Sequence, residues 1–416
     1  MRILYLHPRS WTGEYPMLVK LRSLGHEVCV LEEDRSLSAA RRHAEHFEQS
    51  GDGIPTLWYN PRRGIERLLT WPSDRYHRRA FDGRNLSHRA WIIAAAARHF
   101  RPDVVIASDG FTYAIPAATL RQQGILQAPL VVSFIGGDIL DCPEADYGRR
   151  RTAATPRLIM RVVRYADRLR PVSPKLAAVL RGDGADDKRI GVIPSHLVAD
   201  AEIVGAVLGD RDRIAAAIRA RYGIPPAAPL VVTLSGNQKG KGLHVLAMAW
   251  PRIVAAIPDA HWLLCGPEDP WLVSAVWPQL EAAGVRKSVI ASGRLTGRSV
   301  FEHLAAADVH ANPTLCEGLN MVTVEAAAVG TPTICGDGAG IAGWLERYEA
   351  GAVVPAGDAD AMADATIGAL ANPAQLAAWS EAGLKMTADF TLDRVAAQLL
   401  ALFESTKETP FTRRPD

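Results

Sequence analysis

Residues 307–335 have the sequence ADVHANPTLCEGLNMVTVEAAAVGTPTIC, in which two glutamates frame a short loop and a run of small residues. Residues 307–313 and 331–335 have the short apolar pattern of buried strands, and the segment between them is typical of a loop and a helix. Glu317 then lies where the first strand ends, and Glu325 lies in the helix. This order predicts a parallel α/β sheet with both acids at its carboxyl end, where such sheets bind ligands.

The two glutamates indicate the chemistry of the ligand. A helix N-terminus carries roughly half a positive charge and binds anions, while an ionised carboxylate accepts hydrogen bonds from hydroxyl groups. A site with both features suits a ligand that contains phosphate and hydroxyl groups, such as a sugar nucleotide. The alternative is that Glu317 and Glu325 are two solvated helix charges, and the residues around them argue against it.

Those flanking residues resemble a known family. A glutamate, seven residues, a second glutamate, a small-residue helix and Gly330-Thr331-Pro332 together resemble the donor-site signature of the retaining GT-B glycosyltransferases of group 1 type. Weaker landmarks of the same family follow its order at residues 101–106, 165–173 and 190–194. The resemblance implies an α/β fold of the GT-B type, with two Rossmann-like, doubly wound parallel-sheet domains that face a central cleft.

Short apolar runs alternate with helical stretches along the whole chain, which predicts parallel, doubly wound sheets. The predicted strands are residues 3–6, 27–31, 103–107, 130–135, 230–234, 261–265, 288–291, 308–311 and 332–335.

The pattern restarts after residues 193–210, and 416 residues are too many for one ordinary core, so we expect two domains. These are residues 1–195 and residues 196–391. The resemblance implies that the first domain binds the acceptor and the second binds the nucleotide sugar. It also implies that a C-terminal helix, 392–416, packs back on the first domain.

The composition is that of a globular protein, with 48% hydrophobic and 22% charged residues. A net charge of +2 gives no argument for nucleic acid. Five cysteines without paired spacing favour reduced thiols over a disulfide framework or a zinc site. No apolar run reaches the roughly 18 residues of a spanning helix, and residues 1–7 look like a short strand rather than a signal peptide. We therefore expect a cytoplasmic protein.

A glycine-containing loop, residues 236–242, follows a predicted strand and opens a helix. Glycine lets the backbone approach a ligand closely, and Lys239 and Lys241 place positive charge where a diphosphate would lie. The loop is not a Walker motif, because no Ser or Thr follows the lysine at the required place. The family's loop starts with Gly-Arg and ends with Lys-Gly. Lys241 matches, whereas Asn237 replaces the arginine, for which Lys239 could compensate; the alternative is two solvated lysines.

The resemblance also assigns roles to residues. It implies that Glu325 accepts hydrogen bonds from both ribose hydroxyls, and that Glu317 contacts the transferred sugar. The predicted donor-binding residues are Gly13, Gly236, Asn237, Lys239, Lys241, Gly318, Leu319, Asn320, Met321 and Glu325. The predicted catalytic residues are Glu317, Lys241 and Asp138. Because the leaving diphosphate must be stabilised as the glycosidic bond lengthens, donors aimed at it are the largest expected catalytic contribution.

Two loops of the first domain are candidates for further contacts. Asp138 follows two glycines after a predicted strand, and Ile135 stands where the family often has a histidine, so Asp138 is the available polar group. Its alternative role is a helix cap or a turn. Gly13 stands where the family has a glycine pair.

Two other motifs compete with this interpretation. Residues 338–343 match the glycine fingerprint of dinucleotide-binding domains, but they come late in the second sheet, so we interpret them as a small-residue loop that opens a helix. Asp358 and Asp360 resemble a metal-binding pair, but they precede a helical run, so N-capping is expected. We expect no metal and no cofactor besides the nucleotide-sugar substrate.

The predicted function is retaining transfer of a sugar from a UDP- or GDP-sugar to a hydroxyl acceptor, which could be a small molecule, a glycan or a lipid-linked acceptor. The alternatives are a nucleotide-sugar-binding protein without catalysis and an NAD-dependent dehydrogenase that uses the Gly338 loop. The arginine-rich segments 62–89 and 149–170 are expected to contact the inner face of a membrane or to form solvated helix faces. No nucleic-acid partner is expected.

Overall fold

The computed structural model describes residues 1–6, 12–33, 46–49, 54–59, 65–81, 86–150, 154–236, 239–268 and 270–408. The chain forms two compact units. The first unit consists of Met1–Asp141, Gly148–Pro194 and Leu392–Asp416, and the second consists of Cys142–Tyr147 and Ser195–Thr391.

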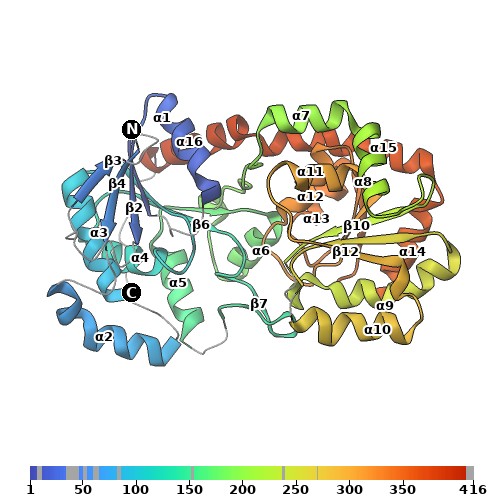
Figure 1. Cartoon of the computed structure of the whole chain (residues 1–416). Helices are drawn as coiled ribbons and strands as arrows, with labels where there is room; N and C mark the ends of the chain where they lie inside the picture. The colour runs from blue at the N-terminus through green and yellow to red at the C-terminus, as the bar shows by residue number, and fades with distance from the viewer. Residues whose placement is uncertain are drawn as a thin grey trace. The chain divides into compact units, whose positions relative to one another are not determined.

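The first unit contains a sheet in the order β3-β4-β2-β1-β5-β6-β9 (Figure 1). All neighbouring strands are parallel except β3 and β4. The strands are β1 (Arg2–Leu6), β2 (Glu27–Glu33), β3 (His46–Gln49), β4 (Pro55–Tyr59), β5 (Val104–Ala107), β6 (Leu130–Phe134) and β9 (Arg168–Pro171).

Two helices from opposite ends of the chain pack together in the first unit. These are α1 (Tyr15–Ser23) and α16 (Leu392–Glu408). Their apolar side chains share one core with the sheet, which includes Ile3, Leu18, Leu21, Val395, Leu399 and Phe403. The remaining helices of this unit are α2 (Ile65–Phe81), α3 (Leu86–Phe100), α4 (Ala114–Gln122), α5 (Thr155–Tyr165) and α6 (Pro174–Gly182).

The second unit contains a fully parallel sheet in the order β12-β11-β10-β13-β14-β15. The strands are β10 (Leu230–Leu234), β11 (His261–Cys265), β12 (Val289–Gly293), β13 (Val309–Asn312), β14 (Thr333–Gly336) and β15 (Gly351–Val354). The chain builds outward from β10 in one direction and from β13 in the other. The loops that follow β10 and β13 therefore lie at the topological switch point, where open α/β sheets bind ligands.

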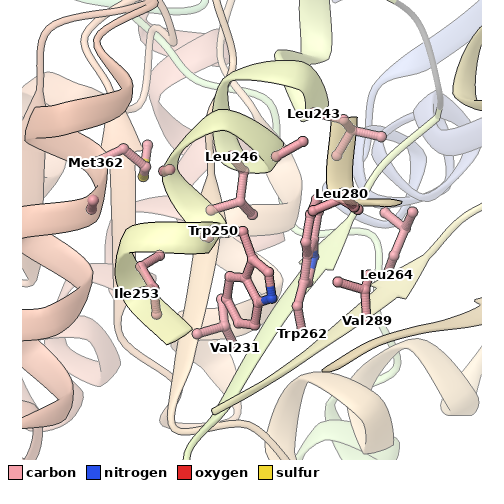
Figure 2. Packing of buried hydrophobic residues seen from close by; sticks show 14 of the residues in the cluster. Val231, Leu243, Leu246, Trp250, Ile253, Trp262, Leu264, Leu280, Val289 and Met362 are labelled. Atoms are coloured by element: carbon pink, nitrogen blue, oxygen red, sulfur yellow. The ribbon is translucent and has the colours of Figure 1, made fainter. Parts of the chain in front are cut away.

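Helices cover both faces of this second sheet, because its strands carry apolar side chains on both sides. The core on one face includes residues of α9 (Leu243–Ala256), α10 (Trp277–Ala282) and α14 (Ala359–Leu370), and Figure 2 shows part of it. The core on the other face includes residues of α7 (Ala201–Gly209), α8 (Arg211–Arg221), α11 (Arg298–Ala305) and α12 (Met321–Ala328). The last two helices are α13 (Ala342–Tyr348) and α15 (Pro373–Met386).

Two tryptophans show how the first of these cores is packed. Trp250 and Trp262 are fully buried, with their ring centroids 5.6 Å apart (Figure 2). Each indole N–H has a partner: Trp250 donates to Ser288 Oγ at 2.8 Å, and Trp262 donates to Thr233 Oγ1 at 3.0 Å. This pairing avoids the cost of burying an unsatisfied donor, and it fixes α9, which begins at the glycine-containing loop.

The predicted fold class is confirmed, since both sheets are doubly wound and mostly parallel. Among the described residues, six strands were not predicted: β3, β4, β9, β15 and the two short strands β7 (Asp141–Cys142) and β8 (Tyr147–Gly148). Among the helices of the described residues, none combines the length and the apolar character that crossing a bilayer requires.

Candidate functional site

The loops that follow β10 and β13 pack directly on each other at the switch point of the second unit. Leu315 N–H donates to the carbonyl of Gly240 at 2.9 Å. Gly242 caps the N-terminus of α9 with a φ of +70°, and a Cβ there would lie 1.8 Å from the carbonyl oxygen of Pro313. Only glycine fits this position, so the predicted glycine-containing loop has a packing role. Asn237 lies outside the described residues.

Lys241 and Glu317 form an ion pair across these two loops. Lys241 Nζ lies 2.5 Å from Glu317 Oε1, and the two side chains are 23% and 21% exposed. The second carboxylate oxygen, Oε2, accepts a hydrogen bond from Asn320 Nδ2 at 2.8 Å. The structure thus brings together three of the predicted site residues from two distant parts of the chain.

Asn320 organises the start of α12. Its φ is +85°, and its Oδ1 accepts a hydrogen bond from the N–H of Thr323 at 3.0 Å, as an N-cap does. Its amide group also donates to the buried Asn312 at 3.3 Å, which in turn accepts from the Thr314 hydroxyl at 2.6 Å. This network of buried polar side chains holds the loop in one conformation. Sequence analysis missed Asn312, although a polar residue that ends a buried strand was a usable signal.

The N-terminus of α12 offers unpaired backbone donors. Within the described part of the chain, the N–H groups of Gly318, Leu319, Asn320 and Met321 donate to no backbone acceptor. Such groups, together with the positive end of the helix dipole, bind anions. The resemblance had implied that the backbone amides of these same four residues bind the donor.

Glu325 lies one turn after Met321, on the same face of α12. It is half-buried, and burial raises the pKa of its carboxyl group from 4.5 to about 7. Among the described residues we find no hydrogen bond or ion pair to this carboxylate. A half-buried carboxylate without a partner costs free energy, and hydroxyl groups of a ligand would offset that cost.

The loop that carries the dinucleotide fingerprint supports the Glu317 loop. Glu317 N–H donates to the carbonyl of Gly338 at 3.0 Å, and Gly340 N–H donates to the carbonyl of Glu317 at 3.2 Å. A Cβ at Gly338 would lie 2.1 Å from the carbonyl oxygen of Leu315. The glycine is therefore required by the close approach of two protein backbones. At the other competing motif, Asp358 caps α14 by accepting from the N–H of Ala361 at 2.9 Å, as predicted.

Lys239 and Gly236 lie on the exposed side of the glycine-containing loop. Lys239 is exposed in a short 3-10 helix, Lys239–Lys241. Gly236 is exposed, and no described residue would come within 4 Å of a Cβ placed there. Its backbone is therefore open to an approaching molecule.

Asp138 belongs to the first unit and binds backbone amides there. It is 4% exposed, and its carboxylate accepts from the N–H groups of Gly110 at 2.7 Å, Gly136 at 2.8 Å and Ile135 at 3.1 Å. Burial, opposed by these bonds, raises its pKa to about 6. The carboxylate thus holds the backbone of Gly110, Ile135 and Gly136 together, and the catalytic role of Asp138 stays a prediction. Gly13 lies in the 3-10 helix Thr12–Glu14 of the same unit.

Asp109 is a second buried acid of the first unit, and sequence analysis missed it. It follows β5 and accepts from the N–H groups of Phe111, at 2.8 Å, and Thr112. Burial raises its pKa, and its charge contributes to the raised pKa of Asp138. An Asp-Gly pair after a buried strand was the available signal.

One prediction about the cysteines is wrong. Cys142 and Cys316 form a disulfide across 174 residues of sequence, whereas the spacing of the cysteines favoured reduced thiols. Cys316 directly precedes Glu317, so the disulfide lies beside the candidate site. The spacing of the cysteines in the sequence could not predict this disulfide, because it is the fold that brings the two residues together. The other three cysteines, Cys29, Cys265 and Cys335, are buried and unpaired by disulfides.

Comparison with known proteins gives two matching family models. The model described as "Glycosyl transferase 4-like domain" matches residues 15–196, and the model described as "Glycosyl transferases group 1" matches residues 228–372. The first match lies largely in the first unit and the second match lies in the second unit. Together they cover most of the chain.

Curated relatives match it in part. The phosphatidyl-myo-inositol mannosyltransferase of Mycobacterium leprae is 28% identical over 170 residues, which are 41% of this chain and 44% of that protein. The GDP-mannose-dependent alpha-(1-6)-phosphatidylinositol monomannoside mannosyltransferase of Mycolicibacterium smegmatis is 32% identical over 187 residues, with coverages of 42% and 48%. The chain thus spans about half the length of these relatives. A Salmonella typhimurium protein named for colanic acid biosynthesis is 25% identical over 351 residues, with coverages of 82% and 80%.

Solved glycosyltransferase structures match along almost the whole chain. Sucrose-phosphate synthase from Thermosynechococcus elongatus has a TM-score of 0.71 at 19% identity, covering 98% of this chain and 99% of that one. HepE from Anabaena, solved in complex with UDP, has a TM-score of 0.73 at 16% identity, covering 97% and 100%. The fold is therefore of the GT-B type. With both family models matched, the chain belongs to the group 1 glycosyltransferase family.

Proposed function

We propose that this protein is a retaining glycosyltransferase that moves a hexosyl group from a nucleoside-diphosphate sugar to a hydroxyl acceptor. The second unit would bind the donor through Lys241, the amides of residues 318–321, and Glu325. The first unit would bind the acceptor. The family membership and the arrangement of the second unit support this proposal.

The single observation that carries the proposal is the state of Glu325. Its carboxylate is half-buried and has no partner among the described residues, and its pKa is raised to about 7. It follows a helix N-terminus where, among the described residues, the N–H groups of residues 318–321 donate to no backbone acceptor. A vicinal diol would donate hydrogen bonds to the Glu325 carboxylate, and a nearby phosphate would accept hydrogen bonds from the N–H groups of the helix N-terminus. The ribose and the diphosphate of a nucleotide have this combination.

The chemical role that we assign to the site is stabilisation of the leaving diphosphate. Lys241 and the amides of α12 would take up negative charge as the glycosidic bond lengthens. Glu317 holds Lys241 at 2.5 Å, so it orients the lysine, and it would contact the transferred sugar. We do not assign it the role of nucleophile. Because Lys241 supplies the positive charge, we propose that transfer needs no metal ion and no cofactor, and activity that survives EDTA would support this.

A direct test identifies the base of the nucleotide-sugar donor. HepE was solved with UDP, and one relative is named as GDP-mannose-dependent, so both bases are candidates here. The purified chain would be incubated with UDP-, GDP-, ADP- and TDP-sugars, and the free nucleoside diphosphate would be measured. We expect slow release with one base and none with the others. Glu325→Ala should abolish both this release and nucleotide binding, and an unchanged variant would refute the assigned role.

We further propose a cytoplasmic protein that contacts the inner face of a membrane, consistent with relatives that are named for phosphatidylinositol substrates. An open groove of about 570 Å³ in the first unit is lined by four arginines, Arg157, Arg161, Arg164 and Arg189. The exposed Met160 lies among them. Guanidinium groups bind phosphate, and an apolar side chain beside them suits a lipid surface.

Binding to vesicles tests this membrane contact. The double variant Arg157→Glu and Arg161→Glu should no longer float with vesicles that contain anionic phospholipid, and it should keep its donor turnover. Arg98→Glu, an exposed charge reversal on α3, is the matched control and should still bind. Equal flotation of both variants would contradict the proposal.

A nucleotide-sugar-binding protein without catalysis remains the alternative, because Asn237 and Ile135 replace two polar residues of the family pattern. Binding without release of nucleoside diphosphate, with every acceptor tested, would favour it. The packing of the Gly338 loop on the protein backbone argues against the dehydrogenase alternative, since a Cβ at Gly338 would lie 2.1 Å from the carbonyl oxygen of Leu315.

A further inference from the structure

We propose that the disulfide between Cys142 and Cys316 is a reversible redox switch that controls access of the nucleotide to the Lys239–Lys241 loop. In the disulfide form the segment Cys142–Tyr147 covers that loop, and reduction releases the segment. The proposal rests on the donor-binding function proposed above, and it adds a modification site and a direction of control.

The position of the disulfide is the first argument. Cys316 lies immediately before Glu317 and is 2% exposed. Its partner Cys142 begins a segment, Cys142–Tyr147, that clusters with the second unit although it is remote from the rest of that unit in sequence. The covalent bond therefore fixes this segment beside the ion pair of Glu317 and Lys241.

The second argument is what the segment covers. The 3-10 helix Pro143–Ala145 packs against the 3-10 helix Lys239–Lys241. A Cβ at Gly240 would lie 3.3 Å from the carbonyl oxygen of Ala145 and 3.9 Å from that of Cys316. Gly240 is buried as a result, whereas its neighbour Lys239 is exposed. A diphosphate cannot approach the backbone at Gly240 while the segment is in place.

The third argument is that the segment has little secondary structure to hold it. It forms the tip of a hairpin whose strands, Asp141–Cys142 and Tyr147–Gly148, are two residues long each. An isolated two-stranded hairpin is at best marginally stable in water. The disulfide is the covalent restraint on the tip, so its loss should allow the tip to leave Gly240.

A dithiol, such as a cellular dithiol protein or dithiothreitol, is the reductant for this disulfide. A reductant thiolate attacks Sγ of Cys142, which is partly exposed, and the bond between the two protein sulfurs breaks. The second thiol of the reductant then closes its own disulfide. In sum, two electrons and two protons pass to Cys142 and Cys316. The other thiols would not compete as thiolates in this exchange, because Cys335 is buried and burial raises the pKa of Cys29 and Cys265 to about 12.

The test compares the full chain in its two redox states. One sample is treated with oxidised and one with reduced dithiothreitol, excess reagent is removed, and alkylation with mass spectrometry assigns the cysteines. Affinity for UDP and GDP is then measured by calorimetry. We expect the reduced form to bind the preferred nucleotide more tightly by at least about fivefold, a typical size for a coupling between two sites.

Two variants make the test specific. Cys142→Ser leaves the residue beside Glu317 unchanged, and it should bind as the reduced form does under both treatments. Cys29→Ala, which removes a buried thiol in β2, should stay redox-sensitive like the original chain. Equal affinity of the two forms, or tighter binding by the oxidised form, would overturn the proposal.

Hydrogen exchange separates this proposal from the proposed function. Reduction should increase amide exchange at residues 142–147 and at Gly240, with no ligand present. If no nucleotide binds either form, the donor-binding function fails. In that case unchanged exchange at these residues overturns the switch, and increased exchange supports the release of the segment.

Discussion

Lys241 and Glu317 are 76 residues apart in sequence, and their side chains lie 2.5 Å apart. Lys241 follows β10 and Glu317 follows β13, which are neighbours in the sheet where the strand order reverses. A second contact, from Asn320 to the other oxygen of Glu317, closes the cluster at 2.8 Å. The cluster therefore presents one lysine held by an acid, beside a helix N-terminus.

Replacing Lys241 by alanine should weaken binding of the nucleoside diphosphate. A hydrogen bond to a charged group contributes about 1.5–3 kcal/mol, which corresponds to roughly a ten- to hundredfold loss of affinity. Calorimetric titration with the preferred nucleotide measures the loss. Lys287→Ala is the matched control, because Lys287 is also in the second unit but is exposed and precedes β12, at the opposite edge of the sheet. An equal loss in both variants would indicate a general charge effect.

Glu325 should make donor binding depend on pH. Its pKa is raised to about 7 by burial, so the proposed interaction with ribose hydroxyls requires the pH to be above that value. Affinity for the nucleotide should fall as the pH is lowered from 8 to 6, on the order of tenfold for one pH unit below the pKa. Glu325→Gln should bind weakly at both values, without this slope. A pH-independent affinity in the unmodified chain would contradict the role.

The same group should lower stability at high pH. The folded-state pKa of Glu325 is raised from 4.5 to about 7. Between these two pH values the folded state keeps a proton that the unfolded state has lost, so the free energy of unfolding falls as the pH rises from about 4.5 through 7. Glu325→Gln removes this loss, so at pH 8 the variant should be more stable by up to about 3 kcal/mol, with little difference at pH 4. Urea denaturation at both values measures it. Glu346→Gln, an exposed acid on α13, should change neither value.

Two glycine substitutions should have opposite effects in the second unit. Gly338→Ala places a Cβ 2.1 Å from the carbonyl of Leu315, so it should destabilise the unit by several kcal/mol, on the order of 3. Gly368→Ala lies inside α14 and meets nothing within 4 Å. It should stabilise the unit by about 0.5–1 kcal/mol through helix propensity. Thermal unfolding compares them, and a tolerated Gly338→Ala would show that the loop has room for a ligand.

Asp138 should act on stability more than on catalysis. Asp138→Ala leaves two buried N–H groups and one partly buried N–H group without their acceptor, so it should cost about 3 kcal/mol or more. Asp138→Asn keeps one oxygen acceptor, and its turnover per folded molecule should stay within about twofold of the original. Asp141→Ala, an exposed neighbour, is the stability control. A large loss of turnover in folded Asp138→Asn would instead support the predicted catalytic role.

The sequence predicted every strand of the second sheet except β15, and it missed β9 in the sheet of the first unit. The strand β9 has the sequence RLRP, and its two arginines favoured an exposed segment over a buried strand. Arg168 and Arg170 are nonetheless buried, because their guanidinium groups bond to the Ser405 hydroxyl at 2.9 Å and the Pro194 carbonyl at 2.8 Å. Those partners come from distant segments, so no local pattern could reveal them.

Local patterns by themselves determined the fold class and singled out the two glutamates as candidate site residues. This was possible because the periodicity of strands and helices, and the spacing of a signature, are properties of neighbouring residues. Only the tertiary structure decided that Lys241 meets Glu317, that Gly338 supports their loop, that Asp138 binds backbone amides, and that Cys142 is bonded to Cys316. The physical reason is that the order of strands in a sheet is set by the packing of helices on its faces. That order, rather than distance along the chain, selects which loops share an edge.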